Sequence, residues 1–181
     1  MDIKGRLVEG NVAYRKLTDP GLLTRMSQKQ EPFVAVLSCS DSRVVPEKIF
    51  NLSMGDAFVV RVAGNSASDP SILGALEYSV TNLNVRSILV LGHTGCGAIR
   101  AALDGRATYN FDHITRDIER ARMKVPLELA NDQNAIAEAN VKLQLRQLED
   151  NSQVIMQAVN ERTLSLMGAM YDISSGAVRF L

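Results

Sequence analysis

The sequence has no excess of either charge and no long apolar run. Its 20 lysine and arginine residues balance 20 aspartate and glutamate residues, so charge alone would hold neither a nucleic acid nor an anionic membrane. No segment approaches the roughly 18 consecutive apolar residues of a membrane span, and the mixed charged and apolar start predicts no export signal. We therefore expect neither nucleic acid nor membrane as a partner.

Cysteine is also scarce, with only Cys39 and Cys96 in the chain. Without an export signal, two cysteines are expected to be reduced thiols and not a disulfide framework. Such thiols serve as core residues, metal ligands or nucleophiles, and the expected location is the cytoplasm.

The overall composition of the chain is that of a globular protein. Apolar residues make up 46% of the 181 residues and charged residues 22%, which excludes a disordered or collagen-like chain. This length can bury a core within one unit. We therefore predict a single domain over residues 1–181.

Short apolar runs alternate with helical patterns in the first half of the chain. Residues 33–37, 56–64 and 87–92 read as strands, and helices are predicted to begin at Pro46 and at Pro70. This alternation predicts an α/β fold with a central, mostly parallel β-sheet flanked by helices. Loops at the carboxyl ends of neighbouring strands then converge on one crevice.

The second half is predicted to add outer helices and a terminal hairpin. Residues 114–147 have helical composition and are divided into two helices by Pro126, and residues 152–162 add another helix. Alternation on both sides of residues 174–176 predicts a C-terminal antiparallel hairpin strand.

Three side chains at the predicted strand ends suit a metal ion. Cys39 follows the first strand, and His93 and Cys96 occupy a glycine-rich turn after the third. Thiolate and neutral imidazole are preferred zinc ligands, and three protein ligands leave one position for water, as in catalytic sites. The alternative is two core cysteines beside a hydrogen-bonded histidine.

Asp41 and Arg43 lie close to the first candidate ligand. In an extended segment, residues two apart point to the same side, so they could form a fork-like pair. A carboxylate fixed by a guanidinium stays ionised and can accept a proton from a metal-bound hydroxide. The alternative is a surface ion pair of little energetic value.

The segments "CSDSRVVPE" and "GHTGCGAI" resemble the two signature segments of the β-class carbonic anhydrases. The resemblance continues through "GDAFVVRVAGN", "GALEYSV" and "MGAMYDISSGAVRFL", and it begins at the early "LVEGN". It implies reversible hydration of carbon dioxide to bicarbonate and a proton by zinc-bound hydroxide, with one zinc per chain.

The resemblance also assigns roles to individual residues. Cys39, His93 and Cys96 match the zinc ligands of the family, and Asp41 and Arg43 match its catalytic dyad.

Further matches concern the substrate pocket. Gln30 matches the glutamine that orients the substrate, and the residues that match the carbon dioxide pocket are Phe58, Ala63, Tyr78 and Gly97. Ala63 replaces a bulkier valine found in some members, which implies a slightly wider pocket.

The resemblance further implies a homodimer or homotetramer. Family members carry an N-terminal helical arm that packs across the partner, and the glutamine reaches the site from the neighbouring chain. The expected partners of this chain are therefore copies of itself and the small-molecule substrate.

The absence of tryptophan narrows the subtype. Members inhibited by bicarbonate carry tryptophan three residues before the first cysteine, where this chain has Val36. We therefore expect no such regulatory pocket and an Asp41 that stays paired with Arg43.

Two alternative functions remain open. One is hydrolysis of carbonyl sulfide or carbon disulfide on the same fold, and the other is a non-catalytic zinc-binding homologue.

Overall fold

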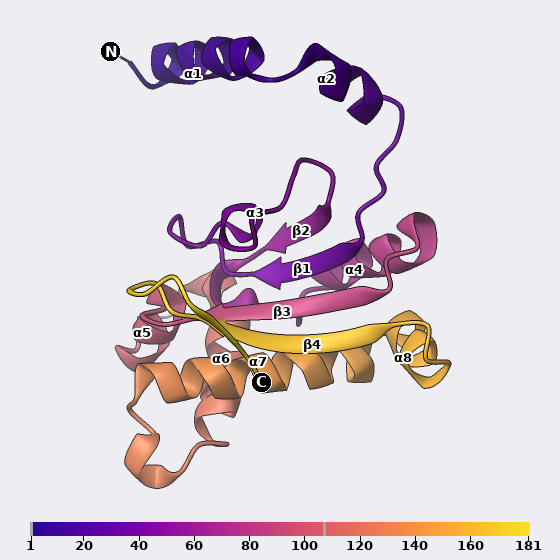
Figure 1. Ribbon diagram of the computed structural model, residues 1–181. Helices are drawn as coiled ribbons and strands as arrows, with labels where there is room; N and C mark the ends of the chain where they lie inside the picture. Colours follow the sequence, from indigo (N-terminus) through magenta and orange to yellow (C-terminus); the bar gives the residue numbers. More distant parts are fainter. Residues whose placement is uncertain (1, 107) are drawn as a thin grey trace. The chain divides into compact units, whose positions relative to one another are not determined.

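The computed structural model describes residues 2–106 and 108–181, and the chain divides into the compact units Met1–Glu31 and Pro32–Leu181. The first unit consists of helices α1 (Ile3–Leu17) and α2 (Pro20–Met26), labelled in Figure 1. This agrees with the helical arm expected at the N-terminus. The single domain over residues 1–181 stays a prediction.

The second unit is built on a five-stranded sheet in the order β2-β1-β3-β4-β5. The first four strands are parallel, and β5 is antiparallel to β4, which confirms the predicted mostly parallel α/β fold with its terminal hairpin. The strands are β1 (Val34–Ser38), β2 (Ala57–Arg61), β3 (Ser87–His93), β4 (Ser165–Tyr171) and β5 (Val178–Phe180).

Helices and 3-10 turns connect and cover these strands. The α-helices are α3 (Pro46–Ile49), α4 (Pro70–Leu83), α5 (Gly97–Leu103), α6 (Asp112–Arg122), α7 (Gln133–Asn151) and α8 (Gln153–Asn160), and the turns are η1 (Ala63–Asn65), η2 (Tyr109–Phe111) and η3 (Leu127–Leu129). In the described part of the chain, no helix has both the length and the apolar character needed to cross a membrane.

Helix α4 illustrates how local sequence sets an element. The Asp69 side chain accepts a hydrogen bond of 2.7 Å from the Ser71 N–H, and Pro70 occupies the first helical turn, where its missing N–H has no cost. Asn84 ends the helix in the left-handed conformation that asparagine tolerates.

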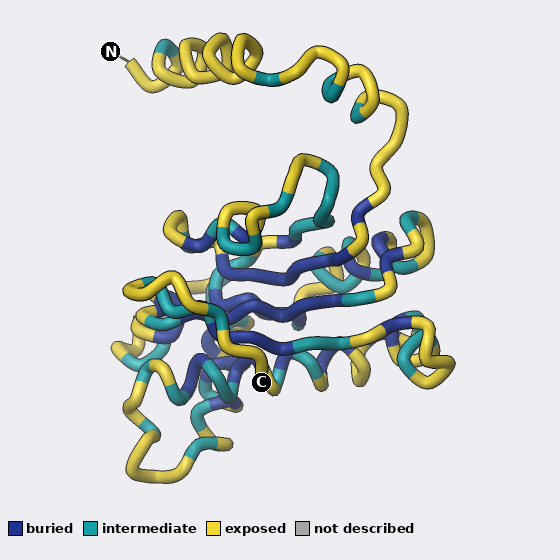
Figure 2. Tube along the Cα trace, in the orientation of Figure 1, coloured by how far each residue is buried: buried dark blue, intermediate teal, exposed yellow. Residues whose placement is uncertain are grey.

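The strands divide the core between the two faces of the sheet. In β1, Ala35 and Leu37 join the cluster that the larger helices cover, whereas Val34 and Val36 join the cluster on the opposite face. This division follows from the two-residue repeat of a strand. Figure 2 shows the central strands buried along most of their length.

Helix α7 lies very close to the sheet because two strand positions have no side chain. A Cβ at Gly92 would lie 2.5 Å from Val141 Cγ2, and a Cβ at Gly168 would lie 2.9 Å from Val141 Cγ1. Such distances are shorter than van der Waals contact. The two glycines therefore let α7 pack directly on β3 and β4, as seen in Figure 1.

Gly168→Ala is expected to lower the free energy of unfolding by about 1–3 kcal/mol, because the added methyl group overpacks a site that Val141 and Leu145 already fill. Gly74→Ala in α4 is the control, since a Cβ there meets no described atom within 4 Å. It should raise the free energy of unfolding by about 0.5–1 kcal/mol through helix propensity. Urea denaturation measures the free energy of unfolding of both variants. The same change in this free energy for Gly168→Ala and Gly74→Ala would contradict the close packing.

Candidate metal centre

Two neighbouring parallel strands bring the three candidate ligands together. Ser38 at the end of β1 pairs with Leu91 of β3, so Cys39 and His93 follow within two residues at the same edge of the sheet. Cys96 lies at the N-cap of α5, in the turn that leaves β3. All three side chains are buried, and their ligand atoms lie within 4.8 Å of one another. The sequence-based grouping of these residues is therefore matched by the geometry.

The histidine ring is prepared to bind a metal ion. His93 Nδ1 lies 3.0 Å from the carbonyl oxygen of Thr94, which makes Nδ1 the donor and leaves the lone pair on Nε2. His93 Nε2 is buried and has no hydrogen-bond partner in residues 2–106 and 108–181. A buried nitrogen without a partner is costly, and a metal ion would satisfy it.

The two thiols also fit a divalent cation. The hydrogen bond with Cys96 lowers the pKa of Cys39, whereas that same contact and burial raise the pKa of Cys96. The pair therefore stabilises one thiolate readily and the second only beside a positive charge. Two thiolates and one imidazole form a zinc donor set, so the residues fit this metal.

Asp41 and Arg43 form the fork-like pair that their spacing predicts. Arg43 Nη2 donates to Asp41 Oδ2 at 2.7 Å, and both Nε and the backbone N of Arg43 donate to Oδ1 at 3.0 Å. Hydrogen bonds from the Arg43 side chain hold the pKa of Asp41 well below its usual range. Arg43 Nη2 also donates to the carbonyl oxygen of Gly95, at 3.2 Å. The carboxylate is therefore ionised and is fixed beside the loop that carries Cys96.

Arg61 is a positioning residue that the sequence analysis missed. Its Nε donates to the carbonyl oxygen of Cys39 at 3.2 Å, and its Nη2 donates to that of Asp41 at 2.7 Å. Arg61 is the last residue of β2, and it pairs with Ser38 in the sheet. The pairing of β1 with β2 is the signal that would have placed Arg61 beside the Cys39 loop.

The predicted pocket residues divide between the two units. Phe58 and Tyr78 pack with ring centroids 6.1 Å apart, Ala63 lies in η1, and the exposed Gly97 opens α5. Gln30 is exposed and belongs to the unit Met1–Glu31, whereas the candidate ligands belong to the other unit. The substrate-binding roles of all five residues stay predictions.

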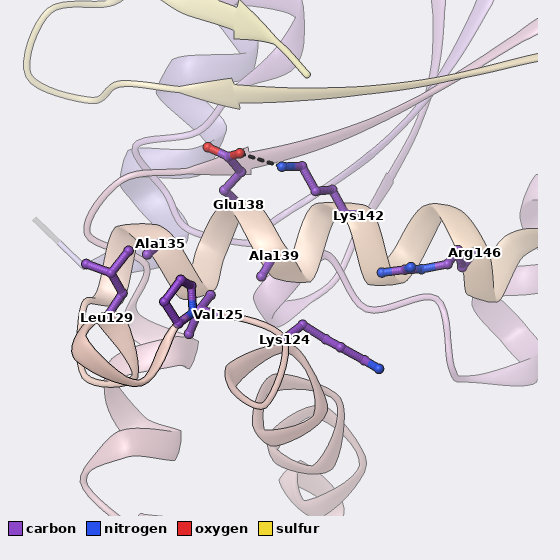
Figure 3. Close-up of a pocket in the computed structure, with 9 residues that line it drawn as sticks. Lys124, Val125, Leu129, Ala135, Glu138, Ala139, Lys142 and Arg146 are labelled. Atoms are coloured by element: carbon purple, nitrogen blue, oxygen red, sulfur yellow. Dashed lines mark hydrogen bonds and ion pairs between the residues drawn. The ribbon is translucent and has the colours of Figure 1, made fainter.

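A groove elsewhere on the surface contains none of these residues. Its volume is about 350 Å³, and Figure 3 shows its lining between α7 and the segment that follows α6. The side chains are Lys124, Val125, Pro126, Leu129, Ala135, Glu138, Ala139, Lys142 and Arg146. The candidate site is therefore identified by the chemistry of its donor atoms and not by the volume of a surface groove.

Thr94 links the histidine to the turn between β4 and β5. Thr94 Oγ1 accepts from the Ile173 N–H at 3.1 Å and donates to Asp172 Oδ1 at 3.4 Å. The same Asp172 oxygen accepts from Ser174 N at 2.8 Å and from Ser174 Oγ at 2.7 Å. These bonds fix the residue whose carbonyl orients His93, and those from Ser174 lower the pKa of Asp172 to about 2.

Comparison with protein families gives one match to most of the second unit. The family model described as carbonic anhydrase matches residues 34–178. A carbonic anhydrase of Mycolicibacterium smegmatis is 36% identical over 161 residues, which cover 84% of this chain and 76% of that protein. Carbonic anhydrase 2 of Mycobacterium tuberculosis is 35% identical over 158 residues, covering 81% of this chain and 73% of that protein.

Solved structures give the same similarity. The β-carbonic anhydrase CafA of Aspergillus fumigatus superposes with a TM-score of 0.87 at 30% identity, covering 98% of this chain and 89% of that one. A structure from a study of two tetrameric β-carbonic anhydrases of Sordaria macrospora gives a TM-score of 0.86 at 28% identity, covering 98% of this chain and 95% of that one.

The Asp172 turn predicts an acid-sensitive contribution to stability. A carboxyl whose folded pKa is about 2, below the ordinary 3.8, stabilises the fold above about pH 4 and loses that effect as the pH falls through 2. Wild type should therefore exceed Asp172→Asn in stability at about pH 5, and the difference should narrow towards about pH 2.5. Chemical denaturation between about pH 5 and pH 2.5 measures the difference in the free energy of unfolding. A difference that does not change with pH would contradict the lowered pKa of Asp172.

Proposed function

The chain belongs to the β-class carbonic anhydrase family, and from this membership we propose that Cys39, His93 and Cys96 hold its zinc ion for the reversible hydration of carbon dioxide. The observation that carries the proposal is the buried trio of donor atoms within 4.8 Å, beside a carboxylate held by a guanidinium. The enzyme is a zinc-dependent carbonate dehydratase, a lyase.

The three ligand residues come from two loops and bind one zinc per chain. Zinc supplies Lewis acidity that makes water a nucleophile near neutral pH. His93 binds through Nε2, because Nδ1 is occupied by the Thr94 carbonyl. The contact with Cys39 and burial raise the pKa of Cys96, and the N–H groups of Ile99 and Ala98 at the start of α5 oppose this rise in part.

Asp41 acts as the acceptor in this proposal. Arg43 keeps the carboxylate ionised and binds both of its oxygens, so the remaining lone pairs can accept a hydrogen bond only from a limited range of directions. The Asp41 side chain is 14% exposed, so the carboxylate is accessible to solvent. A hydrogen bond from the attacking water to Asp41 orients the oxygen lone pair towards carbon dioxide.

We assign the apolar side of the pocket to Phe58, Ala63, Tyr78 and Gly97, and the donor to a developing oxygen to Gln30 of a neighbouring copy of the chain. Carbon dioxide has no net dipole, so contact with aromatic and small apolar groups suits it better than ion pairs. Gln30 carries an amide that can donate a hydrogen bond as negative charge develops on the substrate.

We further propose a homodimer or homotetramer in the cytoplasm. The α1 helix buries none of its described residues, and it exposes Ile3 at 81%, Leu7 at 69% and Leu17 at 87%. Exposed apolar side chains at this density are typical of an interface. Two buried free cysteines that must remain thiols suit a reducing compartment.

The purified protein is expected to contain about one zinc per chain and to hydrate carbon dioxide rapidly. Cys39→Ser and His93→Ala should lose both, because each removes one of the three donors. Metal analysis and stopped-flow hydration on the same sample measure this. Full activity without metal would contradict the proposal, and release of hydrogen sulfide from carbonyl sulfide without carbon dioxide hydration would assign a different substrate.

Asp41→Asn should retain zinc and lower the turnover by about 10–100-fold, since the ligands survive while the charged acceptor is lost. Asp69→Asn is the matched control, because asparagine remains a good N-cap for α4 and Asp69 is exposed. It should leave turnover unchanged. If Asp41→Asn were as active as this control, Asp41 would have no part in the mechanism.

A further inference from the structure

Helix α7 buries amide side chains on one side and exposes charged side chains on another. Asn140 is 1% exposed and Gln144 is fully buried. The charged side, with the ion pair of Glu138 and Lys142 and with Arg146, is seen in Figure 3. Buried amide groups are almost always hydrogen-bonded, because an unpaired polar atom in the core is costly. The hydrogen-bond partners of Asn140 and Gln144 therefore indicate what these side chains do.

These amides lead to a candidate zinc ligand through one chain of hydrogen bonds. Asn140 Nδ2 donates to the Gly64 carbonyl at 2.8 Å, and the Gly64 N–H donates to Cys39 Sγ at 3.4 Å. Gln144 Nε2 donates to Asn140 Oδ1 at 2.9 Å and fixes that amide. Gln144 Oε1 accepts from the Ala67 N–H at 2.7 Å. Both ends of the loop that contains Gly64 are therefore attached to α7.

The loop needs this attachment because one of its non-glycine residues has a sparsely populated backbone conformation. Gly64 has φ of 66°, which glycine adopts readily, whereas Asn65 has φ of 46°, in the left-handed region that other residues adopt less often. Such conformations persist where surrounding contacts determine them. Without the contact at the Gly64 carbonyl, the peptide groups on either side of Gly64 could rotate and turn the N–H away from the sulfur.

We propose that Asn140, held by Gln144, is a positioning residue that aims the Gly64 N–H at Cys39 Sγ and so sets how strongly this thiolate binds the metal. The inference rests on the proposed function, because it requires a metal ion on Cys39. A hydrogen bond to a metal-bound thiolate withdraws electron density from sulfur and fixes its orientation.

The test is the cobalt-loaded Asn140→Leu variant, which keeps the branched shape of the side chain and removes the donor to Gly64. Loss of the N–H bond should make the sulfur more electron-rich, so the thiolate-to-cobalt absorption band should move to longer wavelength. Cobalt affinity, measured by chelator competition, should fall about ten-fold, because the loss of a fixed sulfur orientation outweighs the stronger donation from the electron-rich sulfur.

A matched control separates positioning from stability. Leu148 is also on α7 and fully buried, but it belongs to the apolar core. Leu148→Ala should lower the melting temperature and leave both the absorption band and the cobalt affinity unchanged. An equal spectral shift in Leu148→Ala would show that general loosening is the cause and would overturn the proposal.

The remaining outcomes distinguish the metal site from the positioning role of Asn140. A wild-type protein without any thiolate-to-cobalt band would overturn the proposed metal site itself. A normal wild-type band with no change in Asn140→Leu would overturn the positioning role alone. If Asn140→Leu does not fold, Gln144→Met is measured instead, and a shift in the same direction is expected because the Asn140 amide is released. An unchanged band there would also overturn the role.

Discussion

Two thiols buried beside an imidazole cannot both ionise unless a positive charge lies between them, and the second unit is organised around this requirement. The parallel pairing of β1 with β3 places Cys39 and His93 at one edge of the sheet. The turn after β3 then needs only three more residues to return Cys96 to the same point. Around this point, the Gly64 N–H donates to a sulfur, and Arg61 and Arg43 bind backbone carbonyls of the loops that carry the candidate ligands.

The backbone of both loops is held from several directions. Arg61 binds the carbonyls of Cys39 and Asp41, and Arg43 binds the carbonyl of Gly95. From the start of α7, Gln133 donates to the carbonyl oxygen of Cys96. The carbonyl contacts leave the thiol and carboxylate groups themselves available for chemistry. Rigid support of this kind is what a site needs when its reacting groups must keep a fixed geometry.

Local sequence was sufficient to predict the main helices and strands and the clustering of the three candidate ligands, but not the side chains that support them. The apolar run before Cys39 and the Asp69-Pro70 helix start are local signals, and both lie where they were predicted. The amide of Asn140 bonds a residue 76 positions away, and that of Gln144 bonds one 77 positions away. Nothing in an amide-rich helical segment identifies such partners, so α7 was predicted only as an outer helix. Gln30 shows the same limit, because its assignment came from resemblance alone.

The close contact of Val141 with Gly92 and Gly168 has a consequence for which substitutions this fold can accommodate. Asn140 is the neighbour of Val141, so the residue that sets the spacing between helix and sheet adjoins the one that reaches the Gly64 loop. A larger residue at either glycine would push the helix outward and draw the amide away from its partner. A substitution in the sheet and a substitution in α7 therefore act on the same contact, and positions that carry no reactive group affect the geometry around the candidate ligand Cys39.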